Sequence, residues 1–119
     1  MAEIKINIPE LDRMTYNGVD LTLDMFDRDT LKKVNAAGRA FQNTTNAQIK
    51  NGQFKDAEQA VELSCNGVFK YFDDIFGEDT HKKMFGDEVN FRVVIEVYKA
   101  FAKYAKEQVD GIKDVMSVD

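Results

Sequence analysis

The chain has 119 residues, of which 44% are hydrophobic and 31% charged, and its formal net charge is −5. This length and balance predict a single domain, residues 1–119, with a hydrophobic core, and they exclude an intrinsically disordered chain. The acidic charge argues against sequence-independent binding to nucleic acid, which depends on Lys and Arg. No apolar run reaches the roughly 20 residues of a membrane span, the N-terminus has no signal-peptide pattern, and Cys65 has no partner for an internal disulfide. A cytoplasmic protein is therefore expected.

Residues 1–24 predict a β-hairpin region. The run EIKINI alternates isoleucine with polar residues, as a half-buried strand does. Two further alternating runs, residues 13–16 and 19–23, flank Asn17-Gly18, a pair that favours a tight turn because both residues tolerate positive φ. We therefore expect a hairpin or a small three-stranded antiparallel sheet, which needs a helical layer to pack on.

Residues 27–109 predict a bundle of three longer helices and one short helical turn. The first helix starts after Asp27 or Asp29 and is expected to fade within the polar run QNTTNAQIKNG. The second starts near Lys55, and its apolar residues recur at i, i+4, i+7 and i+11. The last helix is expected to break or fray at Gly111, which leaves residues 110–119 as a mobile tail. The predicted fold is mainly α (α+β), with the hairpin packed on the bundle.

A Phe-Gly-acid-acid unit occurs twice between the second and the last long helix, at Phe76–Asp79 and at Phe85–Glu88. Each glycine is placed to end a helix in the left-handed conformation, and each phenylalanine is placed to anchor that end in the core. Each acidic pair precedes the next helical element, where negative charge is favoured. Thr80 is expected to cap the short turn HKKMF, and Asn90 to cap the last long helix. The double unit therefore predicts turns between helices.

The acidic segment fits no known metal or catalytic pattern. Placing either glycine at the sixth position of an EF-hand loop puts Phe72 or His81 in the first ligand position, where calcium needs oxygen. The only histidine, His81, is expected on a short exposed turn, and Cys65 is interpreted as a small buried hydrophobe on an apolar stripe. We therefore expect solvated acids, with no enzyme activity, no metal site and no cofactor. The acidic side chains of the segment are Asp73, Asp74, Glu78, Asp79, Asp87 and Glu88.

Several apolar residues fall outside the predicted core stripes and are candidates for binding a partner. Apolar residues around more than one face of a helix indicate a second buried surface, which either the hairpin or another protein chain could cover. The first strand adds a second route to association, since an unpaired edge offers main-chain donors and acceptors. A homo-oligomer is expected on these grounds. The candidates are Phe69, Tyr71, Val93, Val97, Tyr104, Ile4 and Ile6.

The run FDDIFGEDTHKKMFGDEVNFRVVIEVYKAFAKY resembles a block found in small proteins of siphophages and prophages of Gram-positive bacteria. Those proteins look like tail assembly chaperones, which are encoded between the major tail protein and the tape measure protein. The match is most specific over residues 71–101. Asp79 stands where the block has glycine, a departure that is expected to alter that turn, because positive φ is costly for a residue with a side chain. The residues that carry the resemblance are Phe72, Asp73, Phe76, Gly77, Thr80, Phe85, Gly86 and Asn90.

The resemblance implies a non-enzymatic protein that binds the tape measure protein during tail assembly. Such a protein works in the host bacterial cytoplasm and is absent from the mature virion, with no role for nucleic acid, membrane or small-molecule substrate. The alternative is a structural tail or connector protein that forms an oligomeric ring and stays in the particle. A small hydrolase that uses the acidic loop is a third class, and it would require a divalent metal.

Overall fold

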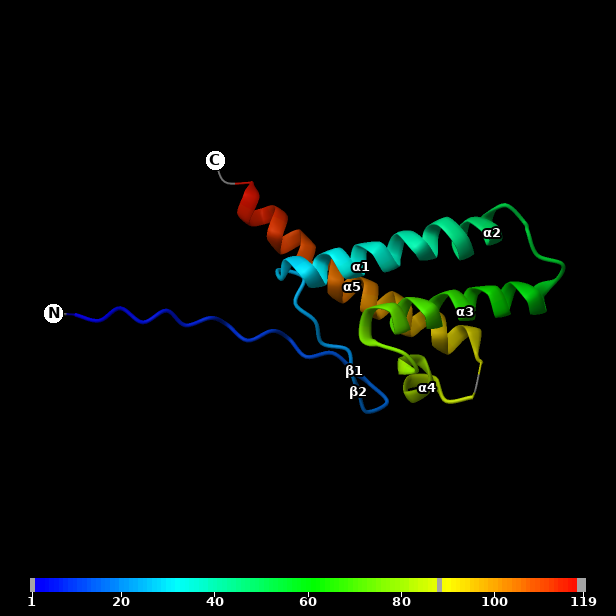
Figure 1. Cartoon of the computed structure of the whole chain (residues 1–119), viewed down its shortest axis with the longest axis horizontal. Helices are drawn as coiled ribbons and strands as arrows, with labels where there is room; N and C mark the ends of the chain where they lie inside the picture. The colour runs from blue at the N-terminus through cyan, green and yellow to red at the C-terminus, as the bar shows by residue number, and fades with distance from the viewer. Residues whose placement is uncertain (1, 88, 118–119) are drawn as a thin grey trace.

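The computed structural model describes residues 2–87 and 89–117 of the chain, and its fold is a helical bundle with a small hairpin at one side (Figure 1). The expectations for Glu88 and for residues 118–119 lie outside the described residues. Three long helices form the bundle, and one short helix, α4, lies beside the hairpin. The predicted mainly α fold with an N-terminal hairpin is confirmed. The elements are β1 (Thr15–Tyr16), β2 (Val19–Asp20), α1 (Arg28–Phe41), the π-helix η1 (Gln42–Asn46), α2 (Ala47–Lys50), α3 (Ala57–Phe76), α4 (Thr80–Phe85) and α5 (Phe91–Met116).

The hairpin turns at Asn17-Gly18, as predicted. Both residues have positive φ, 49° and 79°, and the two strands pair antiparallel with Tyr16 opposite Val19. The strands are shorter than predicted, although the Leu21 amide still donates to the Met14 carbonyl at 2.8 Å. The predicted first strand is wrong, because the run EIKINI has no regular secondary structure and no neighbouring strand to pair with among the described residues.

Helix α1 begins where the sequence predicted, but its end was predicted wrongly. Asp27 is the N-cap, and its carboxylate accepts the Thr30 amide at 3.0 Å. The polar run after Phe41 does not fade: it continues as η1 and then α2, up to Lys50. Packing explains this continuation, because Thr45 lies directly against α3, where a Cβ on Gly67 would come within 2.6 Å of its side chain. A tertiary contact therefore sustains a helix that the local polar sequence does not favour.

The core lies between α1, α3 and α5, and the segment between β2 and α1 covers it with the buried side chains of Leu21, Leu23 and Met25. Phe101 of α5 is fully buried and meets the rings of Phe72 and Phe76 at centroid distances of 5.2 and 5.7 Å, in edge-to-face arrangements. Such aromatic pairs add roughly 0.5–1.5 kcal/mol each beyond the area they bury. The other large, fully buried side chains are Leu21, Met84, Val68, Val94 and Cys65.

Two side chains of α5 hold the chain on either side of the hairpin, before β1 and between β2 and α1. The Tyr104 hydroxyl donates to the Asp12 carbonyl at 2.8 Å. One turn later, the Gln108 side chain accepts the Met25 amide at 2.7 Å and donates to the Leu23 carbonyl at 3.0 Å. These bonds satisfy backbone groups that no regular element pairs, so they fix the hairpin region to the bundle.

Helix α5 continues to Met116, so the predicted break at Gly111 and the predicted mobile tail from residue 110 onward are wrong for the described residues. Gly111 lies against the Phe26 ring, 3.4 Å from where its Cβ would be, and Lys106 pairs with Asp110 at 3.0 Å. These contacts offset the weak helix propensity of one glycine, which costs about 1 kcal/mol. In the described part of the chain, no helix is both long enough and apolar enough to cross a membrane.

Candidate functional site

The double Phe-Gly unit forms a corner that carries α4 between two long helices. Gly77 ends α3 with φ 114° and ψ 161°, and Gly86 ends α4 with φ 66° and ψ −143°. Both glycines have positive φ, as predicted, but neither has the ψ of the left-handed helical region. They lie in or near a region of backbone space that is essentially restricted to glycine, so a side chain at either position would be strained.

Asp79 takes the left-handed conformation in the first turn of the corner. Its φ of 64° and ψ of 9° show that a non-glycine residue adopts positive φ here. Asp79 is also the N-cap residue of α4, so the predicted cap at Thr80 is wrong. Thr80 is instead buried at the first helical position, where its hydroxyl donates back to the Gly77 carbonyl at 2.7 Å.

Asp73, on the last turn of α3, caps α4 from outside. One oxygen of its carboxylate accepts the His81 amide at 2.9 Å, and the other lies 2.7 Å from His81 Nδ1. Asp79 makes no side-chain cap bond, so Asp73 supplies the acceptor that the N-terminus of α4 would otherwise lack. The expectation of a solvated acid is therefore wrong for Asp73, which holds one helix to the next.

The prediction that His81 lies on an exposed turn is also wrong. Its side chain is 22% exposed, and its ring stacks on Phe69 at a centroid distance of 4.6 Å. Phe69 and Asp73 are one helical turn apart on α3, so they share a face and hold the imidazole together. Sequence reasoning missed this pair. The available signal was the i, i+4 spacing of Phe69 and Asp73 shortly before Gly77. The turn at Gly77 brings the chain back against the same face of α3.

The other side of α4 docks on the hairpin. The Asn17 side-chain amide donates to the Met84 carbonyl at 3.0 Å. The Tyr16 ring lies 5.6 Å from Phe85, and Phe85 in turn lies 5.5 Å from Phe69 of α3. The short helix is therefore fixed on both faces, which a six-residue helix needs because it is not stable on its own.

Asn90 begins α5 at the far side of the corner. Its side-chain oxygen accepts the Arg92 amide at 3.0 Å and the Val93 amide at 3.3 Å, which confirms the predicted cap. Phe91 follows at the first helical position with 41% of its surface exposed, so it lies outside the core.

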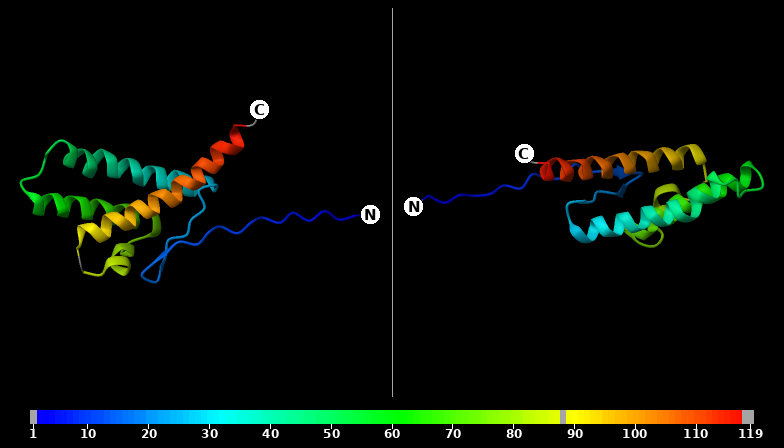
Figure 2. Two further views of the ribbon diagram at one scale, coloured as in Figure 1. Left: turned by 180° about the vertical axis from the view of Figure 1, so that it is seen from behind. Right: turned by 90° about the horizontal axis from the view of Figure 1, so that it is seen from above.

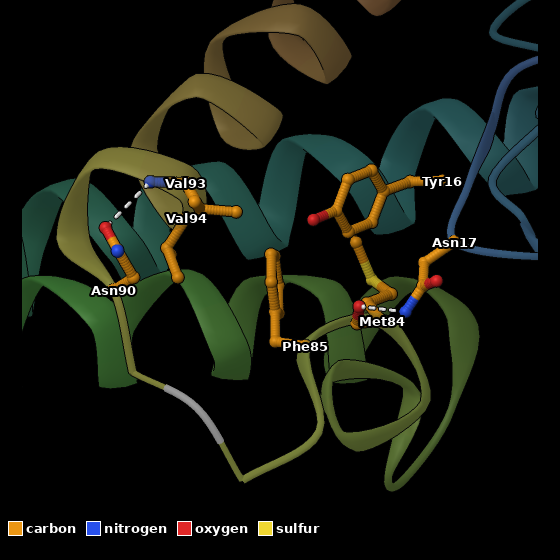
Figure 3. A pocket seen from close by; sticks show the side chains of 7 residues that line it. All are labelled: Tyr16, Asn17, Met84, Phe85, Asn90, Val93 and Val94. Carbon is orange, nitrogen blue, oxygen red and sulfur yellow. Dashed lines mark hydrogen bonds between the residues drawn. The ribbon is translucent and has the colours of Figure 1, made fainter.

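A pocket of about 420 Å³ opens between the hairpin, α4 and the first turn of α5. Figure 3 shows the valines of α5 on one side of this corner pocket, the hairpin residues on the other, and Phe85 between them. The asparagines at its rim are occupied by bonds to the backbone, Asn17 at Met84 and Asn90 at Val93. The residues that line the corner pocket are Tyr16, Asn17, Met84, Phe85, Asn90, Val93 and Val94.

The lining is uncharged and mixes apolar side chains with Tyr16 and the two rim asparagines. No carboxylate, ammonium, guanidinium or imidazole is among the lining residues, so the pocket offers no counter-charge to an ionic ligand. Its volume falls within the roughly 300–1,000 Å³ range of ligand pockets. Among the described residues, no three His, Cys, Asp or Glu side chains gather as metal ligands.

The predicted partner-binding residues separate into three groups. Phe69, Tyr71 and Val97 are buried, 9% exposed or less, so they pack inside the bundle and are not a free surface. Val93 lines the corner pocket, whereas Tyr104 is half-buried and holds the hairpin region. Within the chain itself, the second buried surface indicated by these residues is therefore covered largely by α1, the hairpin and its linker. Ile4 and Ile6 are 89% and 82% exposed.

Burial also determines the proton affinity of three core groups. It raises the pKa of the Cys65 thiol, as expected for a buried cysteine rather than a reactive one. It raises the pKa of the Tyr71 hydroxyl strongly, with a smaller contribution from nearby Tyr98, and it raises the pKa of Tyr98 itself. These groups remain neutral near pH 7, in keeping with a structural role.

Comparison with known families gives one match. The model of the group described as "Family of unknown function (DUF6673)" matches residues 17–118. The chain belongs to this family. The DUF6673 match spans the whole helical bundle and every residue that lines the corner pocket except Tyr16. No curated protein and no solved structure shows a significant match.

Proposed function

We propose that this protein is a non-enzymatic phage tail assembly chaperone that binds the tape measure protein, and that the corner pocket receives an apolar side chain of that client. The observation that carries the proposal is that residues of the double Phe-Gly block, together with the hairpin, form a preformed uncharged pocket. Phe85 and Asn90 belong to the block, and Val93 was predicted to bind a partner. Two residues of the block and one predicted partner-binding residue thus line the same pocket.

The recognition mode follows from the pocket's size and lining. A pocket of about 420 Å³ without charged walls accepts one or two side chains such as Leu, Ile or Phe. An amphipathic helix presents such anchors at i, i+3 and i+4. The tape measure protein, which is the client of the chaperones that the block resembles, is a long helical protein. The net charge of −5 favours a client helix with Lys or Arg beside its apolar anchor.

Co-expression of the full chain with a tape measure fragment tests the proposal. We expect the two to co-purify, and we expect Val93→Glu to weaken the complex by roughly 10-fold or more, because it places a charge against the apolar side chain of the client. Leu31→Glu is the matched control, since Leu31 is another half-buried aliphatic residue on a long helix, α1, and does not line the corner pocket. Failure of the wild-type chain to bind, or equal binding by the Val93 variant, would overturn the proposal.

A structural ring protein that stays in the particle is the second candidate. The exposed isoleucines of the N-terminal run favour it, because they offer a contact between copies. Mass spectrometry of purified virions separates the two functions. A chaperone acts in the host cytoplasm and is absent from the virion, whereas a ring component is present there at a fixed copy number.

A further inference from the structure

Exposed apolar side chains gather at one end of the molecule. Residues 2–11, the N-terminal arm, leave the bundle without regular secondary structure, and Ile4, Ile6 and Ile8 are 89%, 82% and 81% exposed. In all three views the arm and the C-terminal end of α5 lie at the same end of the bundle (Figures 1 and 2). The radius of gyration is 17.4 Å, against about 13–14 Å for a compact domain of this length, because both features project.

The arm has a fixed root and an uncovered apolar face. The bond from Tyr104 to the Asp12 carbonyl holds the point where the arm leaves the bundle. Beyond that point, the three isoleucines alternate with polar residues, so an extended arm turns all three to one side. Single exposed apolar residues are ordinary, but three on one face of a segment, each more than four-fifths exposed, indicate a contact with another chain.

A second apolar surface lies beside the root of the arm. The last turns of α5, residues 109–116, extend past the bundle, and Val115 and Met116 are 66% and 80% exposed. Phe26, which is 56% exposed, lies against the same helix at Gly111. We call these last turns of α5, together with Phe26, the α5 tail surface.

We propose that this end of the molecule is a homodimer interface, in which the N-terminal arm of each copy lies on the α5 tail surface of the other. A two-fold axis at this end brings each arm onto the tail surface of the other copy at the same time, because the arm and the tail surface lie at the same end of each copy. The arm runs away from its own bundle (Figure 1), and Val115 and Met116 of its own α5 tail surface remain 66% and 80% exposed. The proposal does not involve the corner pocket and does not depend on the tape measure client.

The area is sufficient for a stable dimer. An isoleucine that is more than four-fifths exposed contributes on the order of 100 Å² of apolar surface when it is buried. Two reciprocal arms and the surfaces that they cover then bury on the order of 1,200 Å², the lower limit for stable interfaces. The arm alone therefore reaches the required size, and any contact between the two α5 tails adds to it.

Sedimentation equilibrium of the full chain over a concentration series tests the interface. We expect a monomer-dimer equilibrium, and we expect Ile4→Ser with Ile6→Ser to raise the dissociation constant by roughly 100-fold. Phe54→Ser is the control, since Phe54 is an exposed aromatic in the loop between α2 and α3 and should leave the constant unchanged. A monomer at every concentration, or an arm variant that dimerises as tightly as wild type, would overturn the proposal.

Cysteine cross-linking then identifies the two contacting surfaces. Ile6→Cys and Met116→Cys are prepared as separate variants, and Cys65 is fully buried and does not compete. We expect a disulfide-linked dimer only when the two variants are mixed. A dimer from the Ile6 variant alone would mean that arms pair with arms. In a chain that carries both substitutions, a disulfide within one monomer would mean that the arm folds onto its own tail, and either result contradicts the proposed exchange.

Discussion

Removing the carboxylate of Asp73 should destabilise the protein far more than removing that of its neighbour, Asp74. Asp73 accepts the His81 amide at 2.9 Å and contacts His81 Nδ1 at 2.7 Å, and both side chains of this pair are 22% exposed. A lost helix cap costs about 1 kcal/mol, and a lost, partly buried side-chain bond costs about as much again. We therefore expect Asp73→Ala to lower the free energy of unfolding by about 2 kcal/mol.

Asp74 provides a control at the next position of the same helix. It pairs with Lys70 at 2.7 Å, but the two side chains are 40% and 68% exposed, and such pairs contribute only about 0.3–0.5 kcal/mol. Urea unfolding followed by circular dichroism at 222 nm measures both variants. Asp73→Asn keeps one oxygen for the His81 amide, so it should recover at least half of the loss. Equal stabilities of the Asp73→Ala and Asp74→Ala variants, within about 0.5 kcal/mol, would refute the role assigned to Asp73.

Three further outcomes follow from the packing. Gly67→Ala should lower the free energy of unfolding by about 1–2 kcal/mol, because its Cβ would lie 2.6–2.7 Å from Thr45. Gly38→Ala should raise it by about 0.5–1 kcal/mol, because the added Cβ meets nothing within 4 Å. Urea unfolding of the two variants measures both changes. Gln108→Ala should cost about 2 kcal/mol, seen as a lower thermal midpoint, because two backbone bonds to the linker before α1 are lost. Cys65 should react with a thiol reagent at pH 8 only after the chain unfolds, as a colorimetric thiol assay would show, because the side chain is fully buried and burial raises its pKa.

The features that could be predicted from the sequence depend on local chemistry. Asn17-Gly18 makes its turn because both residues accept positive φ, and Asp27 and Asn90 cap their helices because their side-chain oxygens reach amides two or three residues ahead. The corner glycines stop helices for a similar reason. In each case the deciding interaction lies within a few residues, so the pattern contains the whole cause.

The features that were predicted wrongly depend on contacts between distant residues. The polar run after Phe41 remains helical because Thr45 packs on Gly67, and α5 passes through Gly111 because Phe26 lies on that glycine. The Asp73 contact with His81 likewise requires the chain to turn back at the corner. The EIKINI run fails as a strand for the opposite reason, since its pattern is correct but the described chain provides no neighbouring strand.

The corner pocket and the N-terminal arm differ in how much order they possess before any partner arrives. The corner is held from three sides, by Asp73 on α3, by Asn17 on the hairpin and by the Asn90 cap of α5, so a ligand side chain meets walls that are already fixed. The arm is held only at its root, by the Tyr104 bond to Asp12. Ordering a flexible segment opposes binding by roughly 1–2 kcal/mol for each residue fixed, whereas a preformed pocket avoids most of that cost. In the two proposed complexes, the pocket therefore needs only a small contact area for selective binding, whereas the arm has to bury all three isoleucines to hold its partner.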